Sequence, residues 1–388
     1  MFIKKLGGSW IKHPFFRGSL LLGDKNDLTR ILTAGIKDVW IDETKGLARA
    51  AKKEDKALPE EALEVVESST DLIVKKAIVS SMEVEVEHAR KFCDSAKKQV
   101  KLMFDDVRLG KAIDLNITLP LINEIETMIQ RNASAILSVA RLKTHDDYTY
   151  MHSVAVCALM ISLAHHLNLD EEQTRLAGIG GLMHDLGKSF IPLGILNKPG
   201  KLSDAEFVSV RKHAEAGAMI LKKSGAESAV IDIALHHHEK VDGSGYPDKL
   251  AGDDISLLAR MAAICDVYDA VTSQRAYKKA WDPSNAIHKM TQWEGHFDKK
   301  IFAAFVQSVG IYPVGSLVRL SSKRLAVVIE PGIEALLKPK VKVFYSMSTK
   351  TQIPLEIIDL AESECKLTIE GPENPEEWGF KSLENLWL

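Results

Sequence analysis

Two clusters of histidine and carboxylate residues are the parts of this sequence best suited to chemistry. His236–Pro247 (HHHEKVDGSGYP) joins consecutive imidazoles to a glycine-rich turn, and His184–Lys188 (HDLGK) lies upstream of it. Neighbouring imidazole and carboxylate groups form a nitrogen and oxygen ligand set that suits divalent iron, manganese or zinc. Two such clusters in one chain predict a metal-dependent hydrolase.

Size and charge set limits on the ligands of such a hydrolase. A chain of 388 residues is long enough for two or three domains. The apolar fraction of 46% and the charged fraction of 27% are ordinary for globular proteins. The net charge of -3 argues against a binder of nucleic-acid polymers. We therefore expect local cations or metals to hold any ligand that carries phosphate.

Cysteine usage and hydropathy bear on the cellular compartment. The cysteines are scattered without a Cys-x-x-Cys pair, which favours free thiols in a reducing compartment. The longest mainly apolar stretch, Val154–Leu163, is too short to span a bilayer. No sustained apolar segment follows Lys4 and Lys5, so no signal peptide is predicted. These features predict a cytoplasmic protein without a membrane span.

The elements that must position the two clusters are helices. Between about residues 126 and 312, apolar residues recur at helical spacing, and Asp170 and Ser203 are suited to cap helix starts. Both clusters fall in this region, which we interpret as one compact helical domain with ligands converging from several helices. The predicted helices are Glu126–Leu142, Met151–Leu167, Glu171–His184, Asp204–Ser224, Ser228–His238, Ile255–Arg275 and Pro283–Glu294.

The flanking regions have different patterns. Residues 1–125 predict an α/β accessory domain, with a short helix at Asp27–Leu32, a strand at Lys37–Asp42 and a helix at Ser80–Arg108. Residues 313–388 contain β-rich runs that indicate a small antiparallel sheet, at Gly315–Leu320, Leu325–Ile329 and Lys340–Tyr345. The fold class is therefore mainly α. Because the clusters lie only in residues 126–312, we expect that part alone to fold and to carry the chemistry.

The helical region resembles the HD-GYP family, a branch of the HD phosphohydrolases. The residues that carry the resemblance occur in the family's order: Tyr148–Ser153 (YTYMHS), His184–Lys188 (HDLGK), His213, His237–Glu239 (HHE), Asp242–Pro247 (DGSGYP), Asp266–Ala270 (DVYDA) and Arg275. Residues Trp10, His13–Phe16 and Val39–Asp42 resemble a small domain often found before HD-GYP domains. The resemblance implies hydrolysis of cyclic dinucleotides in bacterial signalling, chiefly cyclic di-GMP, to linear pGpG, with GMP as the alternative end product.

The resemblance also implies a binuclear metal site. One ion would be held by His152, His184, Asp185 and Asp266, and the other by His213, His237, His238 and the shared Asp185. Asp185 suits a bridge because a carboxylate has two oxygens, whereas an imidazole has one available lone pair. Iron or manganese is expected, with zinc, nickel or magnesium as alternatives. Tyr148 stands where some members have a glutamate for a third metal, and this favours two ions.

Further residues are implied in substrate contact and catalysis. Asp185 and Lys188 are the catalytic candidates, Lys188 by neutralising the scissile phosphate. Gly245, Tyr246, Asp269 and Arg275 are the other candidates for substrate binding, and the guanidinium fork suits phosphate and guanine equally. Plainer alternatives are that Lys188 is a solvated charge, that Arg275 only pairs with a carboxylate such as Asp269, and that Gly243 and Gly245 only permit a tight turn.

Several functions fit these residues. The first is a phosphodiesterase that acts on cyclic di-GMP, or on cyclic GMP-AMP. The second is a sensor module that binds the nucleotide with little turnover and signals through the flanking domains. The third is an HD phosphohydrolase for another nucleotide or a monoester. The complete ligand set favours the first. A homodimer, and a protein partner at the Gly-Tyr-Pro loop, are also expected.

Overall fold

The structure is a computed structural model that divides the chain into two compact units, Met1–Ile78 and Val79–Leu388. In the first unit it describes a three-stranded antiparallel sheet in which β1 (Phe2–Leu6) lies between β2 (Leu20–Leu21) and β3 (Val39–Ile41). The predicted strand at residues 37–42 is confirmed by β3. The predicted helix at residues 27–32 lies outside the described residues, as do Trp10 and residues 13–16. In the second unit the described residues are 82–143, 148–196, 198, 200–273, 280–332, 336–380 and 382–388.

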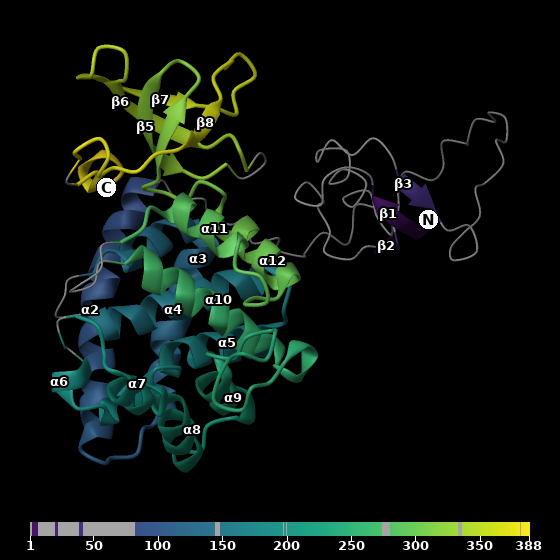
Figure 1. The fold of residues 1–388 in the computed structure, drawn as a ribbon, viewed down its shortest axis with the longest axis vertical. Coiled ribbons are helices and arrows are strands. Elements are labelled where there is room, and N and C mark those ends of the chain that lie inside the picture. Colours follow the sequence, from purple (N-terminus) through teal and green to yellow (C-terminus); the bar gives the residue numbers. More distant parts are fainter. Residues whose placement is uncertain are drawn as a thin grey trace, which may run out of the picture. The chain divides into compact units, whose positions relative to one another are not determined.

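A buried helix, α4 (Tyr148–His166), organises the second unit. Its residues from Met151 to Ala164 are all buried, because that stretch contains no lysine, arginine, aspartate or glutamate. Figure 1 shows α4 running through the middle of the helices. It contacts α2 (Met82–Arg108), α3 (Leu119–Arg141), α5 (Glu171–Met183), α10 (Leu257–Thr272) and α12 (Lys299–Val309). The predicted mainly helical domain is therefore confirmed.

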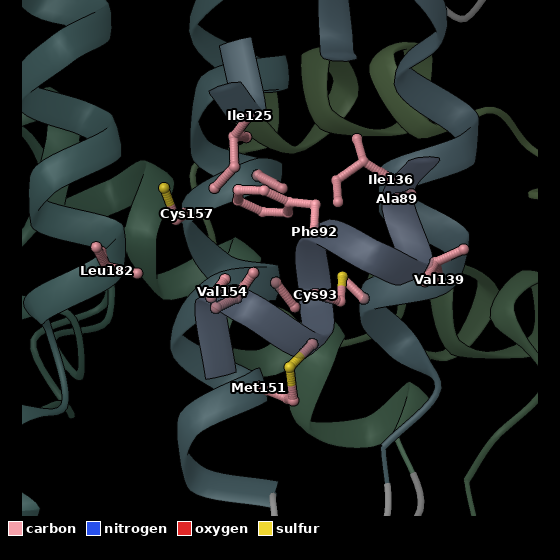
Figure 2. Close-up of a cluster of buried hydrophobic side chains, with 14 of the residues drawn as sticks. Ala89, Phe92, Cys93, Ile125, Ile136, Val139, Met151, Val154, Cys157 and Leu182 are labelled. Carbon is pink, nitrogen blue, oxygen red and sulfur yellow. The ribbon is translucent and has the colours of Figure 1, made fainter. Parts of the chain in front are cut away.

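Helix α2 belongs to the same core as the helices that follow it. Its buried face includes Phe92 and Phe104, which join α3 and α4 in one apolar cluster. Figure 2 shows Phe92 and Cys93 of α2 beside Ile125 of α3 and Val154 of α4. The sequence places this helix in the N-terminal part, and the division into residues 1–125, 126–312 and 313–388 stays a prediction.

Local signals explain most helix boundaries, with two exceptions. Asp170 and Ser203 form capping boxes at the starts of α5 and α7 (Asp204–Arg211), as their side chains predict. The single helix predicted for Asp204–Ser224 is wrong, because the chain breaks at Lys212 into α7 and α8 (His213–Lys223). Apolar spacing continues through that break, so no local pattern marks it. The sequence analysis also missed α12.

Shorter elements complete the helical part. They are η3 (Leu115–Thr118), η5 (Leu186–Phe190), α6 (Leu193–Leu196), α9 (Ser228–His236), η6 (Gly252–Asp254) and α11 (Pro283–Thr291).

Within the described residues, no helix combines the length and apolarity needed to cross a membrane. The described cysteines are free thiols, as predicted, and Cys93, Cys157 and Cys265 are buried.

A five-stranded antiparallel sheet follows the helices, in the order β7-β6-β5-β4-β8. Its strands are β4 (Leu317–Leu320), β5 (Arg324–Glu330), β6 (Lys340–Ser346), β7 (Thr351–Asp359) and β8 (Ile369–Pro372), followed by η7 (Glu384–Leu386). The predicted small sheet is confirmed, although β7 and β8 were not predicted.

This C-terminal part is packed onto the helical part. Leu317, Leu325 and Phe344 belong to the same apolar cluster as α2 and α3. Arg141, at the end of α3, donates from Nη2 to the carbonyl oxygen of Val314 at 2.9 Å, and its Cζ lies 5.9 Å from the ring centroid of Trp387. The end of α3 is therefore held by the C-terminal part.

Candidate metal centre

The predicted ligands come from five places in the chain and meet in the helical part. His152 lies on α4, His184 and Asp185 follow the last turn of α5, and His213 begins α8. His237 and His238 follow α9, and Asp266 lies on α10. All of these side chains are buried except that of His238, which is 23% exposed. Three overlapping groups among them have ligand atoms within 4.8 Å of one another.

A glycine inside the HDLGK motif brings two of these segments together. A Cβ atom added to Gly187 would lie 2.5 Å from the amide nitrogen of Gly217 and closer still to the carbonyl oxygen of His213. Only glycine therefore lets η5 approach α8 so closely. This contact sets the HDLGK segment beside His213, a role that the sequence analysis did not assign to Gly187.

One group of ligand atoms surrounds one oxygen of Asp185. The Nε2 atom of His152 lies 2.9 Å from Oδ1 of Asp266 and 3.5 Å from Oδ2 of Asp185. The Nε2 atom of His184 lies 3.3 Å from the same Asp185 oxygen. Two imidazoles and two carboxylates thus lie close together, and they are the four residues that the resemblance implies for one ion.

A second group surrounds the other oxygen of Asp185. The Nε2 atom of His213 lies 3.3 Å from Nε2 of His237 and 3.2 Å from Nε2 of His238. The same His213 atom lies 3.3 Å from Oδ1 of Asp185. The two oxygens of Asp185 therefore face two different groups of imidazoles.

Hydrogen bonds on the far side of the rings fix which nitrogen is available. The Nδ1 atoms of His184, His213 and His237 lie 2.8, 2.6 and 3.0 Å from the carbonyl oxygens of Gly181, Val210 and Ala234. Because a carbonyl oxygen only accepts, each Nδ1 carries the proton, and each Nε2 offers a lone pair to the centre.

Electrostatics act on the candidate ligands in more than one direction. Burial lowers the pKa of His184, but the charge of Asp185 outweighs it and raises that pKa. Burial, reinforced by the neighbouring imidazoles, lowers the pKa of His237 well below its usual value. Burial raises the pKa of Asp185 and Asp266, but Lys188 and the neighbouring histidines outweigh it and hold both values well below the usual range. Lys188 and His184 have the largest such effects on Asp185, and His152 has the largest on Asp266. Neutral imidazoles and ionised carboxylates are what a metal requires.

The residues present fit a divalent metal. Nε2 lone pairs that face one another at 3.2–3.3 Å repel unless a cation lies between them. His184 Nε2 and Asp185 Oδ1 are buried without a hydrogen-bond partner among the described residues. Burying a polar atom without a hydrogen-bond partner costs about 1–3 kcal/mol per group when nothing compensates for it. A metal compensates for it, and the mixed nitrogen and oxygen set suits a transition metal.

Asp269 lies behind His152, away from the ligand atoms. Its Oδ2 atom accepts hydrogen bonds from Nδ1 of His152, at 2.6 Å, and from Nζ of Lys143. Its Oδ1 accepts from Oγ of Ser273 at 3.3 Å, and Lys143 also donates to that hydroxyl at 3.0 Å. Burial raises the pKa of Asp269, but Lys143 and His152 outweigh it and keep the pKa below normal. Asp269 is therefore enclosed behind His152, whereas the sequence predicted that Asp269 contacts the substrate.

Lys143 was not among the predicted site residues, because its contacts depend on the fold. Replacing Lys143 with methionine is expected to weaken metal binding by about 10- to 100-fold, the usual effect of losing a group that orients a metal-ligating histidine. The physical reason is that Asp269 would lose its buried cation and would hold His152 less firmly. Elemental analysis after dialysis against a weak chelator measures this, with Lys223→Met, an exposed lysine of α8, as the matched control. Equal metal retention by both variants would contradict the role.

Lys188 and the glycine-rich turn border the centre. Nζ of Lys188 donates to Oδ2 of Asp185, and the Lys188 side chain is 21% exposed. The ring of Tyr246 lies 4.7 Å from that of His238 with a 30° tilt. Arg275 lies outside the described residues.

Gly245 and Glu239 shape the turn. A Cβ atom on Gly245 would lie 2.5 Å from the Cα atom of Glu239, so the structure gives this glycine a packing role. The buried Glu239 accepts a hydrogen bond at Oε1 from the amide of Asp248 at 2.7 Å. These contacts hold Tyr246 beside His238, and the sequence analysis gave Glu239 no role.

Comparisons with known proteins agree with this geometry. Residues 121–301 match the HD domain, and residues 1–117 match a domain of unknown function, DUF3391. The chain is 49% identical to a cyclic di-GMP phosphodiesterase of Pseudomonas aeruginosa, over 100% of this chain and 92% of the relative. It is 34% identical to a cyclic di-GMP phosphodiesterase response regulator of Xanthomonas campestris, over 48% of this chain and 49% of that one. It is also 34% identical to a 3'3'-cGAMP-specific phosphodiesterase of Vibrio cholerae, over 48% of this chain and 37% of that one.

Proposed function

Because this chain belongs to the HD-GYP family of metal-dependent phosphohydrolases, we propose that it hydrolyses the phosphodiester bonds of cyclic di-GMP. The relative that matches the whole chain is named for that substrate, and this favours cyclic di-GMP over cyclic GMP-AMP. The HD domain implies divalent metal binding. A sensor with little turnover has less support, because every predicted ligand is present and gathered in one place.

The position of Asp185 carries the proposal of a binuclear centre. Its Oδ2 faces His152 and His184, and its Oδ1 faces His213. A single ion would leave one of these groups with facing lone pairs and no cation. We therefore propose two ions, iron or manganese, with Asp185 as the bridge.

The protein's own groups then have distinct tasks. When bound, the ions supply the Lewis acidity for phosphodiester hydrolysis. Lys188 holds its ammonium beside Asp185, where it can neutralise charge on the scissile phosphate. Burial, with the nearby charges of Asp266 and Asp185, raises the pKa of Tyr246, so its hydroxyl stays protonated and can donate a hydrogen bond. Asp269, supported by Lys143, keeps His152 oriented.

One experiment tests the activity and the metal number together. Full-length protein purified without chelators is analysed for metals and incubated with cyclic di-GMP, 3'3'-cGAMP and cyclic di-AMP. We expect about two ions per chain and the fastest turnover with cyclic di-GMP, with pGpG as the first product. Active protein that retains about one ion or none would contradict the binuclear centre. Metal-loaded protein without turnover would favour the sensor function.

The remaining expectations stay predictions. They concern a homodimer, a protein partner at the Gly-Tyr-Pro loop and a cytoplasmic location. We propose that the N-terminal segment matching DUF3391 regulates the enzyme, since the candidate ligands all lie outside it.

A further inference from the structure

Arg211 has an unusual environment beside the candidate metal centre. It is the last residue of α7, it is exposed, and it precedes His213 by two positions. Its Cζ lies 4.7 Å from the ring centroid of Phe207 and 4.7 Å from that of Tyr246. Within the part of the chain that the structure describes, no carboxylate lies at ion-pair distance from Arg211. Its guanidinium is therefore held by two rings, while its N–H groups lack an anionic partner.

These contacts continue those of the metal centre. Tyr246 contacts His238, Arg211 contacts Tyr246, and Phe207 contacts Arg211 on the same helix. Phe207 is 45% exposed, although a phenylalanine is usually buried. A line of planar groups thus leads from a candidate metal ligand to the surface.

We propose that Arg211 recognises a guanine base of the cyclic dinucleotide, with Phe207 as a stacking surface for that base. The inference rests on the proposed function, and it adds a specificity-determining residue that the motifs of the chain do not include. The guanidinium fork matches the O6 and N7 acceptors of guanine, whereas adenine presents an amino donor in place of O6. Because no carboxylate among the described residues pairs with the guanidinium, its N–H groups remain for a ligand.

A phosphate is the competing ligand for the same fork. The surroundings of Arg211 favour the base. A phosphate gains nothing from the rings of Phe207 and Tyr246, whereas a purine stacks on an exposed aromatic side chain. The scissile phosphate already has Lys188 and the metal ligands to hold it.

The test compares variants of the full-length, metal-loaded protein. Arg211→Ala is expected to raise KM for cyclic di-GMP by about 10-fold or more, the usual effect of losing a bidentate contact to guanine. The kcat should change little, because a contact to the base is the same in the ground state and the transition state. Phe207→Ala should also raise KM. Lys212→Ala, an adjacent exposed lysine with the same loss of charge, is the matched control and should leave KM unchanged.

Two further measurements identify what Arg211 contacts. Metal content should equal that of the wild type, which separates substrate recognition from an indirect effect on His213. Arg211→Lys should fail to restore KM if the planar fork reads a base, and recovery by lysine would instead indicate a phosphate and overturn the proposal. An unchanged KM in Arg211→Ala, with an active wild type, would overturn this inference alone. An inactive, metal-loaded wild type would overturn the proposed function and this inference with it.

Discussion

Replacing Asp185 with alanine is expected to abolish hydrolysis, with a loss of at least about 1,000-fold in kcat, and to deplete bound metal. The reason is that its two oxygens face two different groups of imidazoles, so both ions would lose a ligand. Facing Nε2 lone pairs would then be left without their anionic neighbour. Metal analysis and turnover of cyclic di-GMP by the same preparation measure both effects.

Two companion variants sharpen this test. Asp185→Asn keeps the volume of the side chain but replaces one carboxylate oxygen with an NH2 group, which cannot bind a metal. This variant should therefore retain one ion better than the other. Lys188→Ala should keep the metals, because Lys188 contacts Asp185 without being a ligand, and should slow turnover by about 100-fold. Near-normal turnover by Asp185→Ala would refute its role as the bridge. Loss of metal from Lys188→Ala would move that lysine from substrate contact to support of the site.

The packing of α2 reverses the expectation from the sequence that residues 126–312 fold alone. That fragment is now expected not to fold, whereas a fragment of residues 79–388 should fold and hydrolyse cyclic di-GMP. The short fragment lacks α2, whose buried side chains include Val86, Phe92, Val100 and Phe104. Burying such side chains contributes about 1.5–3 kcal/mol each, or roughly 6 to 12 kcal/mol for these four. That is comparable with the whole stability of a typical domain, about 5–15 kcal/mol.

The short fragment also lacks the C-terminal contacts of α3. Arg141 lies two residues before Lys143. Without residues 313–388 it would lose its contacts with the carbonyl oxygen of Val314 and the ring of Trp387. Thermal unfolding followed by circular dichroism, metal content and turnover compare the two fragments with a third of residues 79–312. A cooperative transition and activity in the 126–312 fragment would show that the flanking contacts are dispensable. A folded, metal-loaded 79–388 fragment without turnover would mean that residues 1–78 contribute to catalysis.

The sequence was sufficient to identify the chemistry of the site. Imidazoles and carboxylates in the motifs around His184 and His237 indicate metal ligands whatever the fold, because their donor atoms are intrinsic to the side chains. Helical apolar spacing also predicted α2, since periodicity reports which face of a local element is buried. Local caps such as Ser203 were legible for the same reason, because they act within one turn of helix.

Only the tertiary structure decided which atoms of the candidate ligands face one another and what supports them. Asp185 directs Oδ2 toward His184 and Oδ1 toward His213. This arrangement depends on the packing of η5 against α8 at Gly187. Lys143 reaches Asp269 across a separation of 126 residues, and no local pattern encodes that contact. The placement of Arg211 against Tyr246 likewise requires α7 to end where it does. Residue types and spacing determine local chemistry and local structure, whereas contacts between distant segments depend on how the helices pack.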